Sequence, residues 1–146
     1  MNSRKNSNQI MKWLQEQRAG YSSLIKVLER QKASVLKDDE GKLLQTINEK
    51  ERILGNLYEI DRKMQFAIES LGQKDHTDLI KVSQPLRDEI EILLSQALTL
   101  ETFCETHIEK KKSSLRDQMK NTKHGRSVLK GYGATLLQQS RFSKNA

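Results

Sequence analysis

The 146-residue chain has 35% apolar and 31% charged side chains, a balance that suits long helices with narrow buried stripes better than a thick globular core. Its one cysteine, Cys104, excludes an intramolecular disulfide framework, and the lack of a long apolar run excludes a membrane-spanning helix. The net charge of +7 is concentrated at one end: residues 118–146 have six basic and no acidic side chains, against 20 basic and 19 acidic in residues 1–117. We therefore expect a nearly neutral body and a basic tail with different roles.

The first predicted helix spans about residues 8–36. Its buried stripe follows alternating steps of four and three, the spacing that places side chains on one face of a helix. The stripe consists of Ile10, Leu14, Gln17, Tyr21, Leu24, Leu28, Gln31 and Val35. The pattern breaks at residues 37–41, where Asp38 and Asp39 are suited to the start of a new helix. The short break predicts an antiparallel hairpin.

The second predicted helix spans about residues 39–71. Lys50 and Asp61 occupy stripe positions where apolar residues are expected. Gly72 is the predicted C-terminal stop, because glycine accepts the left-handed conformation there. Gly55, in mid-helix, indicates a point of close packing. The apolar stripe consists of Leu43, Ile47, Leu54, Leu57, Met64, Ile68 and Leu71.

Residues 73–83 are predicted to be a linker that can include a short helical turn near residues 77–80. Pro85 is predicted to lie in the first turn of a third helix over about residues 84–120. The expected stripe is Leu86, Ile90, Leu93, Ala97, Leu100 and Cys104. The sequence thus predicts an all-α fold: an antiparallel, coiled-coil-like bundle of three long helices within residues 1–121.

Residues 122–146 are predicted to be a basic, mobile or partly helical tail that binds a partner. Apolar residues in the tail would form one stripe if it became helical, the pattern of a helix that enters a groove. The same stripe could instead pack back on the bundle. Arg126 and Lys130 would steer acidic partners. The expected apolar contacts are Val128, Leu129, Tyr132, Leu136, Leu137 and Phe142.

No constellation in the sequence favours catalysis. Glu101, Cys104 and His107 could share a helix face, but zinc sites use four ligands or three with an open position. There is no second cysteine, and His76 and His124 belong to other segments. A nucleophilic cysteine also needs an oriented base and donors for developing charge. We expect no enzyme activity, no metal, no cofactor and no small-molecule substrate. For the tail, a protein partner is favoured over nucleic acid. The cations of the tail are spaced apart rather than clustered, and the apolar residues of the tail would not contact phosphates.

The organisation resembles the FlgN-like flagellar type III export chaperones. The likeness rests on residues 28–33 (LERQKA) before the break at Asp38, on residues 48–54 (NEKERIL), on the long third helix, and on the loose segment with residues 129–133 (LKGYG) and 140–142 (SRF). The chain departs from the family's frequent asparagine in the third helix, where residues 101–107 read ETFCETH. This leaves the neighbouring FliT-like chaperones as an alternative.

The resemblance implies a cytoplasmic chaperone that binds hook-associated (hook–filament junction) proteins, largely through its C-terminal region. It would prevent their premature assembly and deliver them to components of the flagellar export apparatus. Two other readings of the sequence stay open. One is a structural coiled-coil adaptor, dimeric through the long stripes, and the other is nucleic-acid binding through the basic tail.

Overall fold

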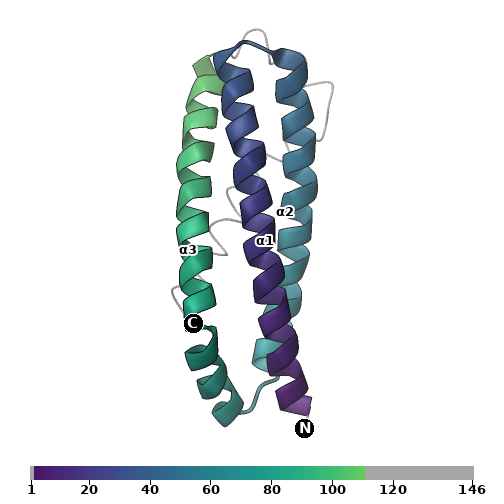
Figure 1. The fold of residues 1–146 in the computed structure, drawn as a ribbon. Coiled ribbons are helices and arrows are strands. Elements are labelled where there is room, and N and C mark those ends of the chain that lie inside the picture. Colours follow the sequence, from purple (N-terminus) through teal and green to yellow (C-terminus); the bar gives the residue numbers. More distant parts are fainter. Residues whose placement is uncertain (1, 111–146) are drawn as a thin grey trace.

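The computed structural model describes residues 2–110, which form an antiparallel bundle of three helices (Figure 1). Helix α1 spans Asn2–Leu36, α2 spans Glu40–Glu69 and α3 spans Gln73–Lys110. Helix α1 packs against both α2 and α3. The predicted all-α bundle of three long helices is therefore confirmed. None of the helices in this described part has an apolar stretch long enough to cross a membrane.

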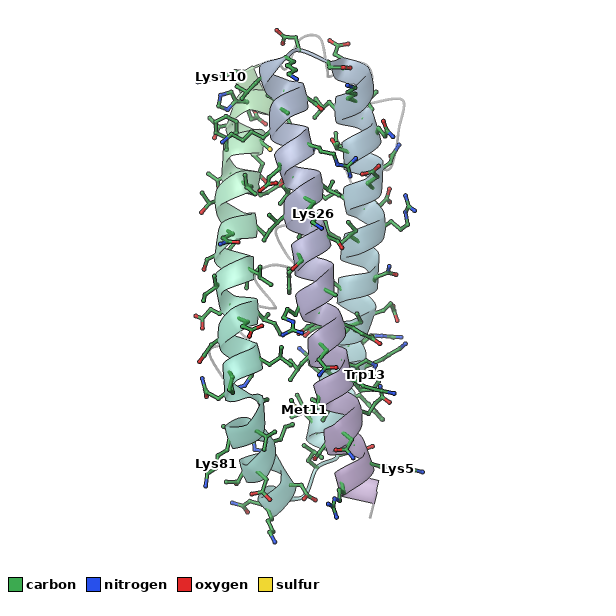
Figure 2. All side chains as sticks on the ribbon, viewed as in Figure 1. Lys5, Met11, Trp13, Lys26, Lys81 and Lys110 are labelled. Atoms are coloured by element: carbon green, nitrogen blue, oxygen red, sulfur yellow. The ribbon has the colours of Figure 1, made fainter. Side chains whose placement is uncertain are left out.

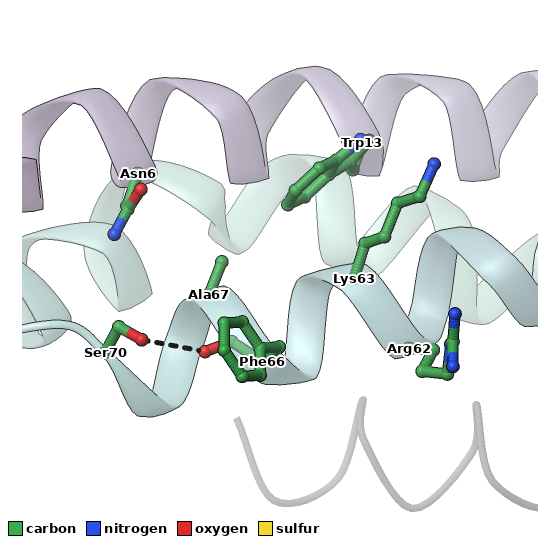
Figure 3. A pocket seen from close by; sticks show the side chains of 7 residues that line it. All are labelled: Asn6, Trp13, Arg62, Lys63, Phe66, Ala67 and Ser70. Carbon is green, nitrogen blue, oxygen red and sulfur yellow. Dashed lines mark hydrogen bonds between the residues drawn. The ribbon is translucent and has the colours of Figure 1, made fainter.

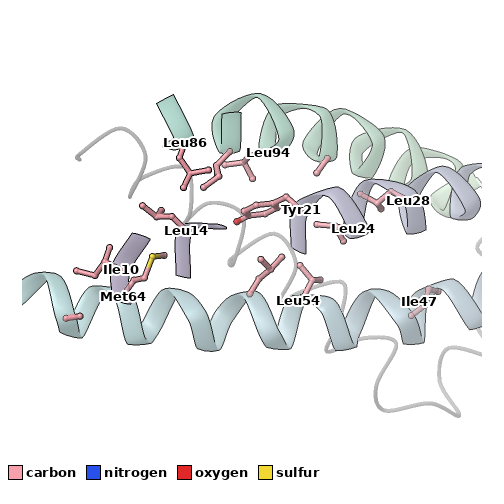
Figure 4. Close-up of a cluster of buried hydrophobic side chains, with 14 of the residues drawn as sticks. Ile10, Leu14, Tyr21, Leu24, Leu28, Ile47, Leu54, Met64, Leu86 and Leu94 are labelled. Atoms are coloured by element: carbon pink, nitrogen blue, oxygen red, sulfur yellow. The ribbon is translucent and has the colours of Figure 1, made fainter. Parts of the chain in front are cut away.

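The predicted stripe of α1 supplies the centre of the core. All eight of its residues are buried, and Gln17 and Gln31 are 0% exposed. Figure 4 shows Leu14, Leu24 and Leu28 of α1 within a cluster that also contains side chains of α2 and α3. The helix begins at Asn2 and not at about residue 8, because no glycine or proline interrupts its first turns.

The connection between α1 and α2 is a tight turn. Asp38 adopts a positive φ of 56°, a left-handed conformation that aspartate tolerates better than most residues. The side chain of Asp39 accepts a hydrogen bond from the backbone N–H of Lys42 at 3.1 Å and so caps α2, as its sequence position predicts. Helix α2 ends at Glu69, and Ser70 caps it in a right-handed conformation. The prediction that Gly72 ends α2 in a left-handed conformation was wrong, because no glycine among the described residues has positive φ.

The start of α3 was also predicted incorrectly. Residues 73–83 are helical, and Pro85 lies inside α3 rather than in its first turn. Proline removes a backbone N–H donor in this position. Near it, Arg87 donates hydrogen bonds to the Ile80 carbonyl at 2.9 Å and to the Ser83 hydroxyl at 3.0 Å. These side-chain bonds, together with burial of Leu79, hold the turns before Pro85 in the bundle.

In the middle of α3, the buried residues lie one position later in the sequence than the residues that were predicted to be buried. Leu94 and Glu101 are buried, whereas Leu93 and Leu100 are only partly buried. Steps of four, three, four and three from Ile90 lead through Leu94, Ala97 and Glu101 to Cys104, so the buried face continues regularly. The predicted end of this helix at about residue 120 and the tail over residues 122–146 lie outside the described residues.

Charged residues occur inside the bundle as well as on its surface. Lys50 of α2 is 0% exposed, and its Nζ donates to the Glu101 carboxylate of α3 at 3.1 Å and to Gln31 Oε1 of α1 at 3.2 Å. One buried ammonium group therefore links all three helices. Burial raises the pKa of Glu101 to about 6, although the attraction to Lys50 lowers it.

Candidate partner-binding surface

The eight tail residues predicted to contact a partner all lie outside the described residues. They are Arg126, Val128, Leu129, Lys130, Tyr132, Leu136, Leu137 and Phe142. A different candidate surface, formed by α1 and α2 within residues 2–110, was not predicted from the sequence.

Three hollows follow the outer junction between α1 and α2. The α1 residues along this junction recur every seven positions, as Asn6, Trp13, Gly20, Val27 and Ser34. A seven-residue repeat returns to the same side of a helix. The hollows therefore lie in one line, which we call the α1–α2 seam. A Cβ atom on Gly20 would lie 2.7 Å from Leu57 Cδ2, so the side chain of Leu57 packs closely against α1 at Gly20.

The first hollow is aromatic. It has a volume of about 420 Å³ and lies between Trp13 of α1 and Phe66 and Ala67 of α2. Figure 3 shows Ala67 and Lys63 pointing from α2 toward α1, from which Trp13 extends toward α2. Phe66 is 74% exposed, the largest exposed fraction among the described large apolar residues. Trp13 and Phe66 thus offer a partner an accessible aromatic contact.

The other two hollows are bordered by cations. The middle hollow, of about 450 Å³, has Val27 and Ile53 at its floor and Lys26 and Arg52 at its edges. The upper hollow lies beside the α1–α2 turn, has a volume of about 250 Å³ and includes Lys37 and Lys42. Arg30 lines both of these hollows.

The seam is basic although the rest of the described part is not. Its three hollows have seven basic and only two acidic lining residues, whereas residues 2–110 as a whole have 17 basic and 18 acidic side chains. Both acids are already engaged, because Glu49 forms an ion pair with Arg30 and Asp39 caps α2. Within the described residues, five of the seven cations form no ion pair. They are Lys26, Lys37, Lys42, Arg52 and Lys63.

The residues considered for a metal or a nucleophilic site have other roles in the bundle. Cys104 is buried, with its Sγ 3.9 Å from the Leu28 carbonyl oxygen, and Glu101 is bonded to Lys50. His107 Nδ1 lies 2.9 Å from the Phe103 carbonyl oxygen, and its ring stacks on the Phe103 ring. Among the described residues no group of three or more potential metal ligands is found.

Sequence reasoning missed the seam although one signal for it is visible. The residues Asn6, Trp13, Gly20, Val27 and Ser34 repeat every seven positions beside the main stripe of α1. The repeat does not show which helix packs beside it or that basic residues of α2 line the same junction. These facts required the structure. Comparison of the chain with protein-family models, with curated proteins and with solved structures finds no match.

Proposed function

We propose that this protein is a cytoplasmic export chaperone for hook–filament junction proteins. In this role it binds them before export, prevents their premature assembly and delivers them to the flagellar type III export apparatus. The protein acts by binding and carries out no reaction.

The observation that carries the proposal is the division between a packed bundle and an apolar, basic C-terminal sequence. Within residues 2–110, buried apolar side chains of all three helices form one core cluster. Residues 118–146, beyond the last acidic residue, combine six cations with apolar residues such as Leu129 and Tyr132. The resemblance of the sequence to FlgN-like chaperones supplies the identity of the partner.

Such a division suits reversible binding. A chaperone must hold the aggregation-prone helical ends of its substrate and then release them to the export machinery. Apolar contacts made by a segment that becomes ordered on binding bring affinity, and the entropy lost on ordering limits that affinity. The cations raise the rate of association with acidic partners.

The test is a calorimetric titration of the full chain with purified hook–filament junction proteins. The variant Leu129→Ala/Tyr132→Ala is predicted to bind at least about tenfold more weakly, because two apolar anchors are shortened. Its helix content, measured by circular dichroism, should match that of the wild type. The control is Val82→Ala/Ile92→Ala, which shortens two α3 residues that are 65% and 60% exposed.

Absence of binding by the full chain to every hook–filament junction protein would refute the proposal. An obligate dimer in sedimentation at several concentrations, combined with that absence, would favour the coiled-coil adaptor. Binding to nucleic acid that weakens steeply with salt would favour the third reading.

A further inference from the structure

We propose that the α1–α2 seam is a second binding surface, and that its occupant is an acidic amphipathic helix of the partner protein. This inference rests on the proposed function, because it takes the bound substrate to be a helical protein. It adds a site within residues 2–110 and states the chemistry of the segment that the site recognises.

Charge complementarity gives the first requirement for the occupant. Lys26, Lys42 and Arg52 are exposed and form no ion pair within the described residues. Of the two acidic residues of the seam, Glu49 forms an ion pair with Arg30, and Asp39 accepts a hydrogen bond from the backbone N–H of Lys42 at the start of α2. A partner that carries carboxylates along its flanks would meet cations on both the α1 and the α2 side.

The shape and floor of the seam give the second requirement. Val27 is buried and Ile53 partly buried at the floor of the middle hollow, and the aromatic pair Trp13 and Phe66 forms the far hollow. From Asn6 to Ser34 the seam is about 42 Å long at the helical rise of 1.5 Å per residue. A long helix with one apolar stripe fits this arrangement, because its stripe would meet the apolar residues of the middle and far hollows while its flanks meet the cations.

Other occupants fit the seam less well. The segment 118–146 of the same chain is itself basic without acidic residues, so its charge has the same sign as the seam. A second copy placed seam to seam would bring two basic surfaces together. A phosphate backbone or an anionic lipid surface would bond with the cations but would make no use of the apolar floor and of the aromatic hollow.

The single tryptophan of the chain makes binding at the seam directly measurable, because Trp13 lines the aromatic hollow. The full chain is titrated with a tryptophan-free amphipathic peptide of about 25 residues, with leucine along one stripe and glutamate on both flanks. The same peptide with lysine in place of glutamate is titrated in parallel. A single-stranded oligonucleotide and phosphatidylglycerol vesicles complete the set.

The matched variants test position and not only net charge. Lys26→Glu/Lys42→Glu reverses two charges of the seam, and Lys74→Glu/Lys81→Glu reverses two exposed lysines of α3. Lys42 and Lys74 both lie near the start of a helix. Figure 2 shows Lys26 on α1 and Lys81 on the outer side of α3.

The proposal predicts that the glutamate peptide changes the Trp13 fluorescence and that the lysine peptide does not. The seam variant should weaken binding of the glutamate peptide at least about tenfold, and the α3 variant less than about twofold. If the seam variant and the α3 variant lost affinity for the glutamate peptide equally, binding would depend only on general charge attraction. That result would overturn the proposal. Tighter binding of the oligonucleotide or of the vesicles than of the peptide would also overturn it.

The two proposals fail separately. Unchanged binding of hook–filament junction proteins by Lys26→Glu/Lys42→Glu would overturn the seam inference and leave the proposed function standing. If the glutamate peptide bound in a way that the seam variant weakened, but no hook–filament junction protein bound, the inference about the seam would stand. The proposed function would then be refuted.

Discussion

Gly20 and Gly55 occupy different packing environments in α1 and α2. A Cβ atom at Gly20 would lie 2.7 Å from Leu57 Cδ2, whereas a Cβ atom at Gly55 would meet nothing within 4 Å. The sequence-based prediction that Gly55 marks close packing was therefore wrong, and Gly20 occupies the close approach. Both glycines lie inside helices, so the intrinsic gain from alanine is the same at the two positions.

We predict that Gly55→Ala raises the free energy of unfolding by about 1 kcal/mol, because it gains helix propensity without a clash. Gly20→Ala gains the same propensity but overpacks against the buried Leu57, which costs about 1–3 kcal/mol. It should therefore be less stable than Gly55→Ala by about that amount. Urea denaturation followed by circular dichroism measures both, and equal stabilisation by the two substitutions would contradict the close approach at Gly20.

The buried thiol of Cys104 should be unreactive in the folded protein. Burial, with a further contribution from Glu101, raises the pKa of Cys104 to about 11. Only about one thiol in a thousand is then ionised at pH 8, and the sulfur is also shielded from reagent. We predict alkylation by iodoacetamide at pH 8 at least about 100-fold slower in native protein than in urea. Equal rates in the two conditions would place Cys104 at the surface, and Cys104→Ala provides the unlabelled control.

At the scale of the helices, the contact between Lys50 and Glu101 links α2 to α3, and Gln31 joins it from α1. Ionised Glu101 is destabilised by burial, which is why the pKa of this carboxyl lies at about 6 and above its ordinary value of 4.5. A folded-state pKa above the unfolded one means that stability falls as the pH rises between these values. Lys50 offsets part of this loss by attracting the carboxylate.

We predict that Lys50→Met destabilises the bundle by about 3 kcal/mol at pH 7, because it leaves the Glu101 carboxylate buried without its cation. The loss relative to wild type should be much smaller at pH 5, where Glu101 becomes protonated. The double variant Lys50→Met/Glu101→Leu should recover most of the stability at pH 7, because no buried charge remains. Urea denaturation at both pH values provides the measurement. The same loss at pH 5 as at pH 7 would contradict this role for Glu101.

The sequence predicts the regular part of these elements well, because the stripes of α1 and α2 follow helical spacing over many turns. It fails where a distant residue decides the local structure. Glu101 was not predicted as a core position, since a carboxylate is buried there only because Lys50 reaches it from α2. Residues 73–83 were predicted as a linker because Pro85 suits a first helical turn, while the bonds of Arg87 to Ile80 and Ser83 depend on the folded helix.

For the whole molecule, the two candidate binding surfaces differ in how far the sequence reveals them. The tail residues, including Leu129 and Tyr132, could be proposed from composition alone because they combine cations and apolar side chains after the last acidic residue. The α1–α2 seam could not, because it joins cations of two helices, such as Lys26 and Arg52, that lie far apart in the sequence. Both surfaces are basic, so an acidic helical partner could engage them together.

The most direct test of this account is hydrogen–deuterium exchange of the full chain, alone and with a hook–filament junction protein. We predict slower exchange on binding in peptides covering residues 126–142, and in those parts of α1 and α2 that border the seam. The outer turns of α3 should be unchanged. Protection confined to α3, or no protection in any peptide, would contradict the claim that this protein is a chaperone acting through these surfaces.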